Sequence, residues 1–260
     1  MSREFFTWER AAKLNPLLWT GHYPFDLRKI KAESLTIALK LDFSPNDSLL
    51  DLGCGMGLYN IFWSKMVGEQ ILLDISNEML KKAKSILTNL RAEIHLINCD
   101  ARYLPIRNES VNKIVCLGVL KHLDRNPLST FQTLKEADRI LKVAGKLYVN
   151  DLVLWPHFNS ILEKIAGFAA LCFKYFTPGS YYYRKTDLEA MMKILHNGSV
   201  SLRGYGWKPI MSDIIFRFLP KIFHHRVERI LRNKVQRINI HDTLFSIYSH
   251  LELLYEKVRK

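Results

Sequence analysis

A glycine-rich turn at residues 51–57 (DLGCGMG) follows the short apolar stretch 48–52 and precedes a helical pattern. Glycines at such a turn let the backbone approach a ligand closely, and the start of the next helix offers free N–H groups. The segment therefore predicts a ligand-binding turn between a strand and a helix. The alternative is a tight turn that needs glycine for its backbone conformation alone.

The spacing of the glycines separates two ligand classes. Dinucleotide-binding turns follow the pattern G-x-G-x-x-G, but the position of its third glycine is Leu58 here, and the third glycine is Gly57. Asp51, at the start of the turn, would repel a pyrophosphate but can accept hydrogen bonds from an ammonium group. We therefore expect a ligand with an amino group at this end of the turn.

Two more carboxylates follow later strand candidates. Asp74 comes directly after the stretch 70–73, and Asp100 follows the stretch 93–98. A carboxylate at the end of the second strand of such a fold can accept hydrogen bonds from both hydroxyls of a ribose. The alternatives are a helix cap for Asp74 and a solvated loop acid for Asp100.

The elements that must position these residues alternate in type along the chain. Short apolar stretches alternate with helical patterns, which predicts βαβ units and a parallel sheet with helices on both faces. After residue 151 the alternation weakens, and Thr186 with Glu189 predicts a capped helix start. We expect strands at 48–52, 70–73, 93–98, 113–117, 146–150 and 200–205, and helices at 25–41, 59–66, 76–90, 131–141 and over most of 207–260.

Five ordered pieces of the chain resemble class I S-adenosylmethionine-dependent methyltransferases, most closely their small-molecule and lipid branch. The resemblance implies a doubly wound, Rossmann-like α/β fold with seven mostly parallel strands and helical N-terminal and C-terminal additions. The chain has Ala144 where many relatives have glycine, and Asn112 where many have aspartate. The pieces are Leu50–Gly57, Leu73–Ser76 with Met79-Leu80, Cys99–Ala101 with Leu104-Pro105, Lys113–Val115 with Leu120 and His122-Leu123, and Leu134–Gly145.

The resemblance also implies which residues bind S-adenosylmethionine. Asp51 faces the methionine ammonium, Asp74 the ribose hydroxyls, and Asp100 the adenine amino group. Ile75 and Met79 pack on the adenine ring, although ordinary core packing is the alternative for both. The backbone of Ala101 and of Leu117 contacts the adenine and the ammonium, respectively. The full implied set is Asp51, Gly53, Cys54, Gly55, Gly57, Asp74, Ile75, Met79, Asp100, Ala101 and Leu117.

Composition limits the remaining possibilities. The chain has 260 residues, of which 48% are hydrophobic, and its 38 Lys and Arg against 25 Asp and Glu give a net charge of +13. This excludes a disordered or fibrous chain and favours nucleic acid, an anionic membrane surface or a phosphorylated substrate as a partner. The sequence shows no pattern typical of a signal peptide, a membrane-spanning helix, a zinc site or a disulfide framework. We therefore expect a cytoplasmic protein without a metal site, which could also contact a membrane surface peripherally.

Three parts of a single domain are expected. Residues 1–46 form an N-terminal helical cap, 47–151 the cofactor-binding core, and 152–260 an aromatic-rich substrate lid, late strands and basic C-terminal helices. Trp8, Trp19 and Tyr23 are candidate lid residues or core aromatics. The basic amphipathic stretch 214–238 predicts a helix on an anionic membrane or one docked on its own domain.

The expected reaction is methyl transfer by in-line displacement to an apolar or amphiphilic small molecule, such as a lipid, isoprenoid or quinone precursor. Basic charge also suits RNA methylation, and a non-catalytic binding protein of the same fold is a third alternative. No pair of residues in the C-terminal half identifies a base, so no catalytic residue is assigned. His122 is either a proton acceptor or a supporting hydrogen-bonded residue.

Overall fold

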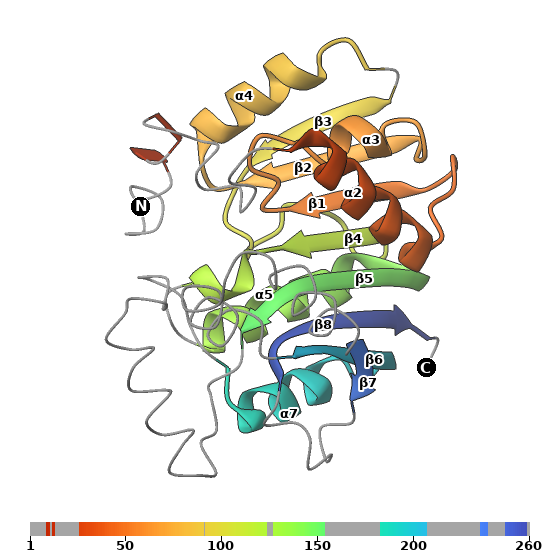
Figure 1. Cartoon of the computed structure of the whole chain (residues 1–260), viewed down its shortest axis with the longest axis vertical. Coiled ribbons are helices and arrows are strands. Elements are labelled where there is room, and N and C mark those ends of the chain that lie inside the picture. The colour runs from red at the N-terminus through yellow and green to blue at the C-terminus, as the bar shows by residue number, and fades with distance from the viewer. Residues whose placement is uncertain are drawn as a thin grey trace, which may run out of the picture.

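A single eight-stranded sheet forms the centre of the molecule (Figure 1). The computed structural model describes residues 9, 10, 12, 13, 26–90, 92–123, 127–153, 183–206, 235–238 and 248–258. The strand order is β3-β2-β1-β4-β5-β8-β6-β7. The strands are β1 (Ser48–Leu52), β2 (Glu69–Asp74), β3 (Glu93–Asn98), β4 (Val111–Leu117), β5 (Leu141–Val153), β6 (Gly198–Gly206), β7 (Val235–Ile238) and β8 (Tyr248–Lys257).

The parallel half of this sheet confirms the predicted mostly parallel α/β fold class, but the sheet has eight strands and not the seven expected, because β7 pairs with β6 at its edge. β3, β2, β1, β4 and β5 are parallel neighbours, and β1 is buried along its whole length. Such burial is typical of a strand covered by helices on both faces. Parallel strands end at the same edge of a sheet, so the segments that follow β1 to β4 meet there.

The antiparallel half contains β8, which pairs with β5 on one side and β6 on the other, and the four-residue edge strand β7. The expectation of mostly helical structure over 207–260 is therefore wrong for β7 and β8. Leu251, Leu253 and Tyr255 join one core cluster, while the residues between them face the other side of the sheet. This period of two is typical of a strand.

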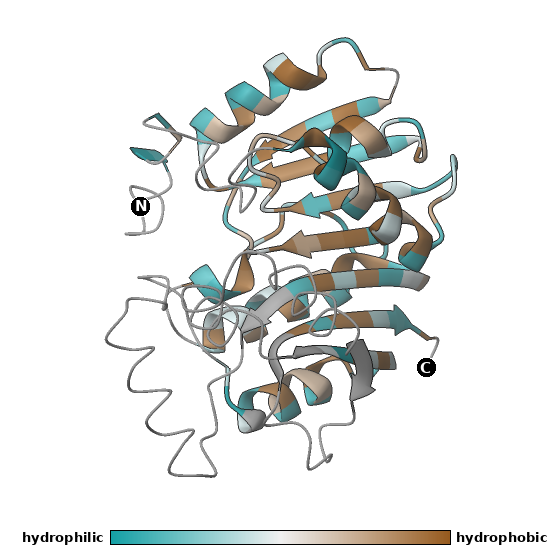
Figure 2. Ribbon diagram, in the orientation of Figure 1, coloured by the Kyte–Doolittle hydropathy of each residue, from teal (hydrophilic) through white to brown (hydrophobic). Residues whose placement is uncertain are grey.

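Helices cover both faces of the sheet. They are α2 (Leu27–Leu41), α3 (Asn60–Trp63), α4 (Asn77–Leu87), α5 (Pro127–Ile140) and α7 (Lys185–Ile194), with a 3-10 turn, η2 (Leu120–His122). α2 and α3 share one core cluster with β1, β4 and β5, and α5 and α7 belong to a second. Figure 2 shows α4 with alternating hydrophobic and hydrophilic residues, as expected for a helix with one buried face. Within the described ranges, no helix has the length and apolar character needed to cross a membrane.

Local capping fixes several helix ends. Asp26 accepts a hydrogen bond from the Arg28 backbone at 2.9 Å and begins α2. α7 begins two residues earlier than predicted, because Arg184 is its N-cap and Asp187 accepts from the Arg184 backbone N–H at 2.7 Å. The predicted cap at Thr186 is therefore wrong.

Some predictions fall outside the described residues. These are the lid candidates Trp8, Trp19 and Tyr23, the aromatic segment 154–182 and the basic stretch up to residue 234. The division of the chain into cap, core and lid accordingly stays a prediction.

Candidate functional site

The glycine-rich turn is tightly packed at Gly53 and has open space beside Gly55. Gly53 and Gly55 have φ angles of 78° and 55°, in the left-handed region that favours glycine. A Cβ atom on Gly53 would lie 2.2 Å from Val119 Cγ2, whereas one on Gly55 would meet nothing within 4 Å. Space for a ligand therefore lies beside Gly55. Gly57 has a packing role, since its Cβ would lie 2.9 Å from Leu87 Cδ1.

The turn is joined to the end of β2 by hydrogen bonds. The backbone N–H groups of Gly53 and Cys54 donate to the Leu73 carbonyl, at 2.7 and 3.0 Å. The N–H of Gly55 donates to Asp74 Oδ2 at 2.8 Å, and the N–H of Ser76 donates to Asp74 Oδ1 at 2.9 Å. The carboxylate of Asp74 therefore fixes the turn. The Ile75 N–H is a third backbone donor to this carboxylate, which leaves it acceptor capacity for about one further hydrogen bond.

Two buried carboxylates meet at this edge. Asp51 and Asp74 are 4% and 9% exposed, and no ion pair joins either to a described lysine or arginine. Burial, reinforced by the charge of Asp74, raises the pKa of Asp51 to about 7, although a hydrogen bond from Asn60 opposes the shift. Burial also raises the pKa of Asp74. Such a site gains free energy by binding a cation, because a cation offsets the cost of burying the negative charge.

The thiol of Cys54 is unreactive. Burial, followed by the charges of Asp74 and Asp51, raises the pKa of its thiol well above the usual range. A thiol in these surroundings stays protonated at neutral pH and is a poor nucleophile. Its predicted contribution through the backbone is compatible with its position in the turn.

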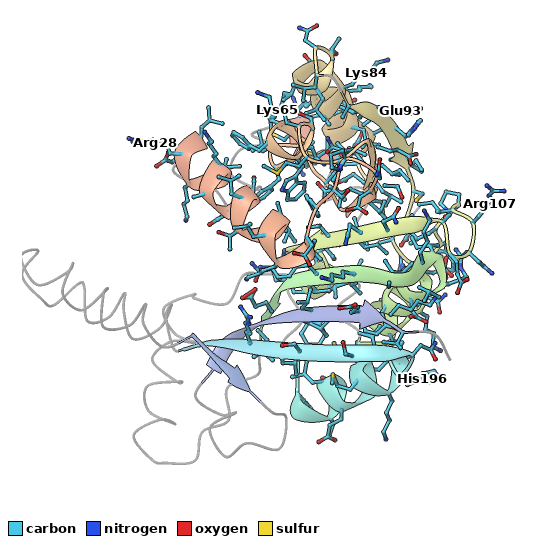
Figure 3. The ribbon with its side chains drawn as sticks, turned by 90° about the vertical axis from the view of Figure 1, so that its right-hand side faces the viewer. Arg28, Lys65, Lys84, Glu93, Arg107 and His196 are labelled. Atoms are coloured by element: carbon cyan, nitrogen blue, oxygen red, sulfur yellow. The ribbon has the colours of Figure 1, made fainter. Side chains whose placement is uncertain are left out.

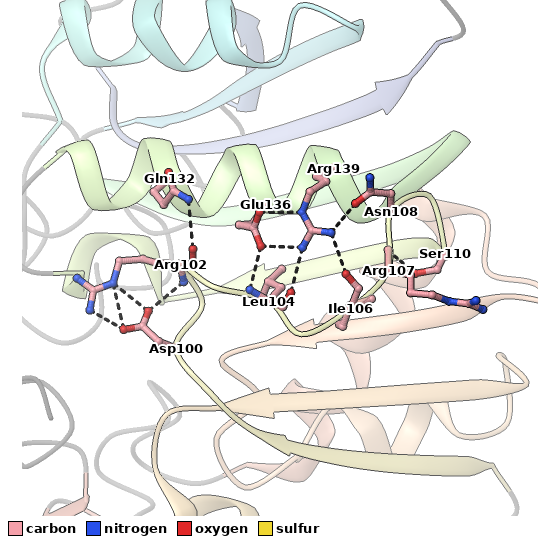
Figure 4. Close-up of polar contacts among 10 residues, drawn as sticks. All are labelled: Asp100, Arg102, Leu104, Ile106, Arg107, Asn108, Ser110, Gln132, Glu136 and Arg139. Carbon is pink, nitrogen blue, oxygen red and sulfur yellow. Dashed lines mark hydrogen bonds and ion pairs between the residues drawn. The ribbon is translucent and has the colours of Figure 1, made fainter.

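Asp100 differs from the other two carboxylates because it already has a cationic partner. Its oxygens accept hydrogen bonds from the guanidinium of Arg102, including one of 2.5 Å from Nη2, and the Arg102 backbone N–H donates to Oδ1 at 2.9 Å (Figure 4). Burial would raise the pKa of Asp100, but these hydrogen bonds and the charge of Arg102 outweigh it and lower the pKa. The sequence reasoning missed Arg102, although an arginine two residues after an acid in a loop is a recognisable signal.

Further contacts fix the ends of β2 and β3 and the loop after β3. Asn98 Nδ2 donates to the carbonyls of Asp74 and Ile75, at 3.0 and 2.9 Å. Farther along the loop, Arg139 of α5 donates to the Leu104 carbonyl at 3.0 Å and to Glu136 (Figure 4). These contacts hold the loop that carries Asp100 next to the end of β2.

The remaining predicted residues divide by burial. Met79 and Ala101 are buried, whereas Ile75 and Leu117 are partly exposed at the ends of β2 and β4. Burial of Met79 is compatible with the core-packing alternative, while the exposed part of Ile75 leaves it accessible to a ligand. The structure thus brings the predicted set to one edge of the sheet, with Gly57 and Met79 set into the core beneath it.

Comparisons with known proteins agree with this arrangement. Residues 49–145 match the family model described as a methyltransferase domain. The chain is 25% identical over 171 residues to the methyltransferase GfsG of Streptomyces halstedii, covering 63% of this chain and 56% of GfsG. It is 31% identical over 105 residues to the ubiquinone/menaquinone biosynthesis C-methyltransferase UbiE of Vibrio campbellii, covering 37% of this chain and 40% of UbiE.

A solved structure of similar fold is a SAM-dependent methyltransferase from Archaeoglobus fulgidus. The TM-score is 0.58 at 17% identity, and the match covers 93% of this chain and 99% of the other. The chain spans about half, or less, of the length of the curated relatives it matches. The likeness therefore concerns the domain and its fold.

Proposed function

Because residues 49–145 match the model of a methyltransferase domain, we propose that this chain is a class I S-adenosylmethionine-dependent methyltransferase, which binds S-adenosylmethionine beside the glycine-rich turn and transfers its methyl group. The observation that carries the proposal is the pair of buried carboxylates, Asp51 and Asp74, next to the open space at Gly55. S-adenosylmethionine has a positive ammonium group and ribose hydroxyls, which are the cation and the donors that such a pair accepts.

The roles of the residues follow from their positions. Asp51 accepts from the ammonium group, and Asp74 accepts from the ribose hydroxyls through the acceptor capacity that its backbone donors leave. Ile75 packs against the adenine. Asp100 accepts from the adenine amino group while it remains paired with Arg102. The adenine donor either uses a free lone pair of the carboxylate or replaces one of the Arg102 hydrogen bonds.

The chain contributes orientation and exclusion of water to the reaction. S-adenosylmethionine supplies an electrophilic methyl group on a positively charged sulfur. A bond forms from the acceptor to the methyl carbon as the carbon–sulfur bond breaks, and the electron pair of that bond stays on sulfur. Holding the three atoms in line contributes up to roughly 7–11 kcal/mol in the best cases. No base is assigned among the described residues.

The acceptor we propose is an apolar or amphiphilic small molecule, such as a lipid, isoprenoid or quinone precursor. The likeness to UbiE, whose name specifies ubiquinone and menaquinone biosynthesis, supports this class. The aromatic-rich sequence at 152–183 supports it as well. Peripheral contact with an anionic membrane would bring the chain to such a substrate, and the net charge of +13 favours that contact.

Isothermal titration calorimetry with S-adenosylmethionine tests the cofactor assignment. We expect Asp74→Ala to weaken binding at least about tenfold, since a charge-assisted hydrogen bond is lost. Glu93→Gln is the control, because Glu93 points outward at the start of β3, away from the carboxyl edge (Figure 3). Equal affinity of wild type and Asp74→Ala would contradict the ribose assignment.

A second experiment separates the acceptor classes. The chain is incubated with methyl-labelled cofactor and either a lipid extract or total RNA. Label in the organic phase supports an amphiphilic acceptor, whereas label in RNA supports the alternative. Cofactor binding without transfer to either extract would contradict the proposed acceptor class and favour a non-catalytic binding protein.

A further inference from the structure

A short N-terminal segment, of which the structure describes residues 9, 10, 12 and 13, is attached to the first turn of α4. Glu9 Oε2 accepts a hydrogen bond from Ser76 Oγ at 2.6 Å and from the Glu78 backbone N–H at 3.4 Å. Ala12 of the same segment is fully buried. Figure 1 shows this segment, in red, beside the start of α4.

The charges of the segment match those of the helix start. Glu9 is a carboxylate at the N-terminus of an eleven-residue helix, where the helix dipole favours negative charge. Lys13, four residues later, lies close enough to Glu78 for its charge to lower the pKa of that carboxyl, after the larger effect of Lys81. The hydrogen bonds to Glu9 and the charge of Lys13 therefore both favour this position of the segment at the helix start.

Ser76 links this attachment to the cofactor site. Its backbone N–H donates to Asp74, its hydroxyl donates to Glu9, and the same hydroxyl oxygen accepts from the Met79 N–H at 3.2 Å. Glu9 is also near enough to Asp74 for its charge to affect that carboxyl. The segment therefore lies against the turn that we assign to the nucleoside.

Helix capping accounts for only one of the two hydrogen bonds that Glu9 accepts. The Glu78 N–H is a free amide of the first turn of α4, so its bond to Glu9 caps the helix beside the bond from the Met79 N–H to Ser76. The shorter bond, from the Ser76 hydroxyl at 2.6 Å, satisfies no helix amide. What Glu9 adds is a connection between the N-terminal segment and the turn at Asp74–Ser76.

We propose that Glu9 is a positioning residue, which holds the N-terminal segment over the nucleoside end of the cofactor site and so slows cofactor release. The inference rests on the proposed function, because the turn at Asp74–Ser76 matters here as the nucleoside-binding turn. Glu9 touches no reacting atom; it acts through Ser76.

The test compares the dissociation rate and Kd of S-adenosylhomocysteine for wild type, Glu9→Ala, Glu9→Gln and the surface control Glu93→Gln. We expect Glu9→Ala to raise the dissociation rate and Kd about tenfold, as for the loss of one charge-assisted hydrogen bond. Glu9→Gln keeps an acceptor oxygen for Ser76 and should recover most of the affinity. Glu93→Gln should behave as wild type.

Hydrogen exchange supplies a readout that a purely structural role would not change. Bound S-adenosylhomocysteine should slow exchange in the peptide containing residues 9–13 of wild type, and this ligand-dependent protection should disappear in Glu9→Ala. Wild-type dissociation rates and protection in Glu9→Ala would overturn the inference, and so would an equal loss in Glu93→Gln. If wild type itself binds no cofactor, the proposed function fails instead, so the two failures are distinguishable.

Discussion

Cofactor binding should depend on pH through Asp51. This carboxyl is buried next to Asp74, Cys54, Tyr59 and Asn60, and its pKa is raised to about 7. Below pH 7 it therefore holds a proton in the free protein and cannot balance the charge of an ammonium group. Binding the cation requires the ionised form, so acid should weaken affinity.

The size of the effect follows from the pKa. If only the ionised form binds, the apparent Kd rises by a factor of about 2 at pH 7 and about 11 at pH 6, relative to its value at high pH. From pH 8 to pH 6 the change is therefore about tenfold. At pH 6 binding should also release about 0.9 proton per site.

Calorimetry in buffers of different ionisation enthalpy measures both quantities at once. Asp51→Asn is the matched variant: it should bind more weakly at pH 8 and lose the acid-side pH dependence. Because the cofactor's own amino group titrates identically in both experiments, the difference between the proteins isolates Asp51. An equal Kd at pH 6 and pH 8 in wild type, with no proton released, would refute the assignment.

Three further predictions concern stability. Gly53→Ala should lower the free energy of unfolding by about 3 kcal/mol in urea titrations, from the left-handed φ and the overlap with Val119, whereas Gly55→Ala should cost only about 1 kcal/mol and mainly weaken cofactor binding. Without cofactor, the free energy of unfolding should fall by about 3 kcal/mol between pH 5 and pH 8. The raised pKa of Asp51 favours the folded state at low pH, and this contribution is lost as the pH rises through 7. Asp51→Asn should lack this contribution. Ala144 has a φ of 61°, so Ala144→Gly should raise the thermal midpoint and stabilise the fold by about 1 kcal/mol, and a lower midpoint would show that no strain exists there.

Local sequence patterns determined the core of the fold. The strands β1 and β3 occupy the predicted residues, and the glycine-rich turn directly follows β1, as predicted. The short apolar stretches are strands buried on both faces, and the helical patterns are helices buried on one face. Both patterns can be recognised from neighbouring residues alone. The order of such elements then limits the sheet to a parallel arrangement with its ligand edge at the strand ends.

Contacts between distant residues decided the rest. The strand β8 pairs with β5 and β6, which lie far from it in the sequence, and these pairings set its place in the sheet. The partner of Asp100, the bond from Ser76 to Glu9, and the raised pKa of Asp51 likewise arise only when the chain is folded. Sequence specifies which groups are present, but their protonation and partners depend on burial and distance, which only the tertiary structure sets.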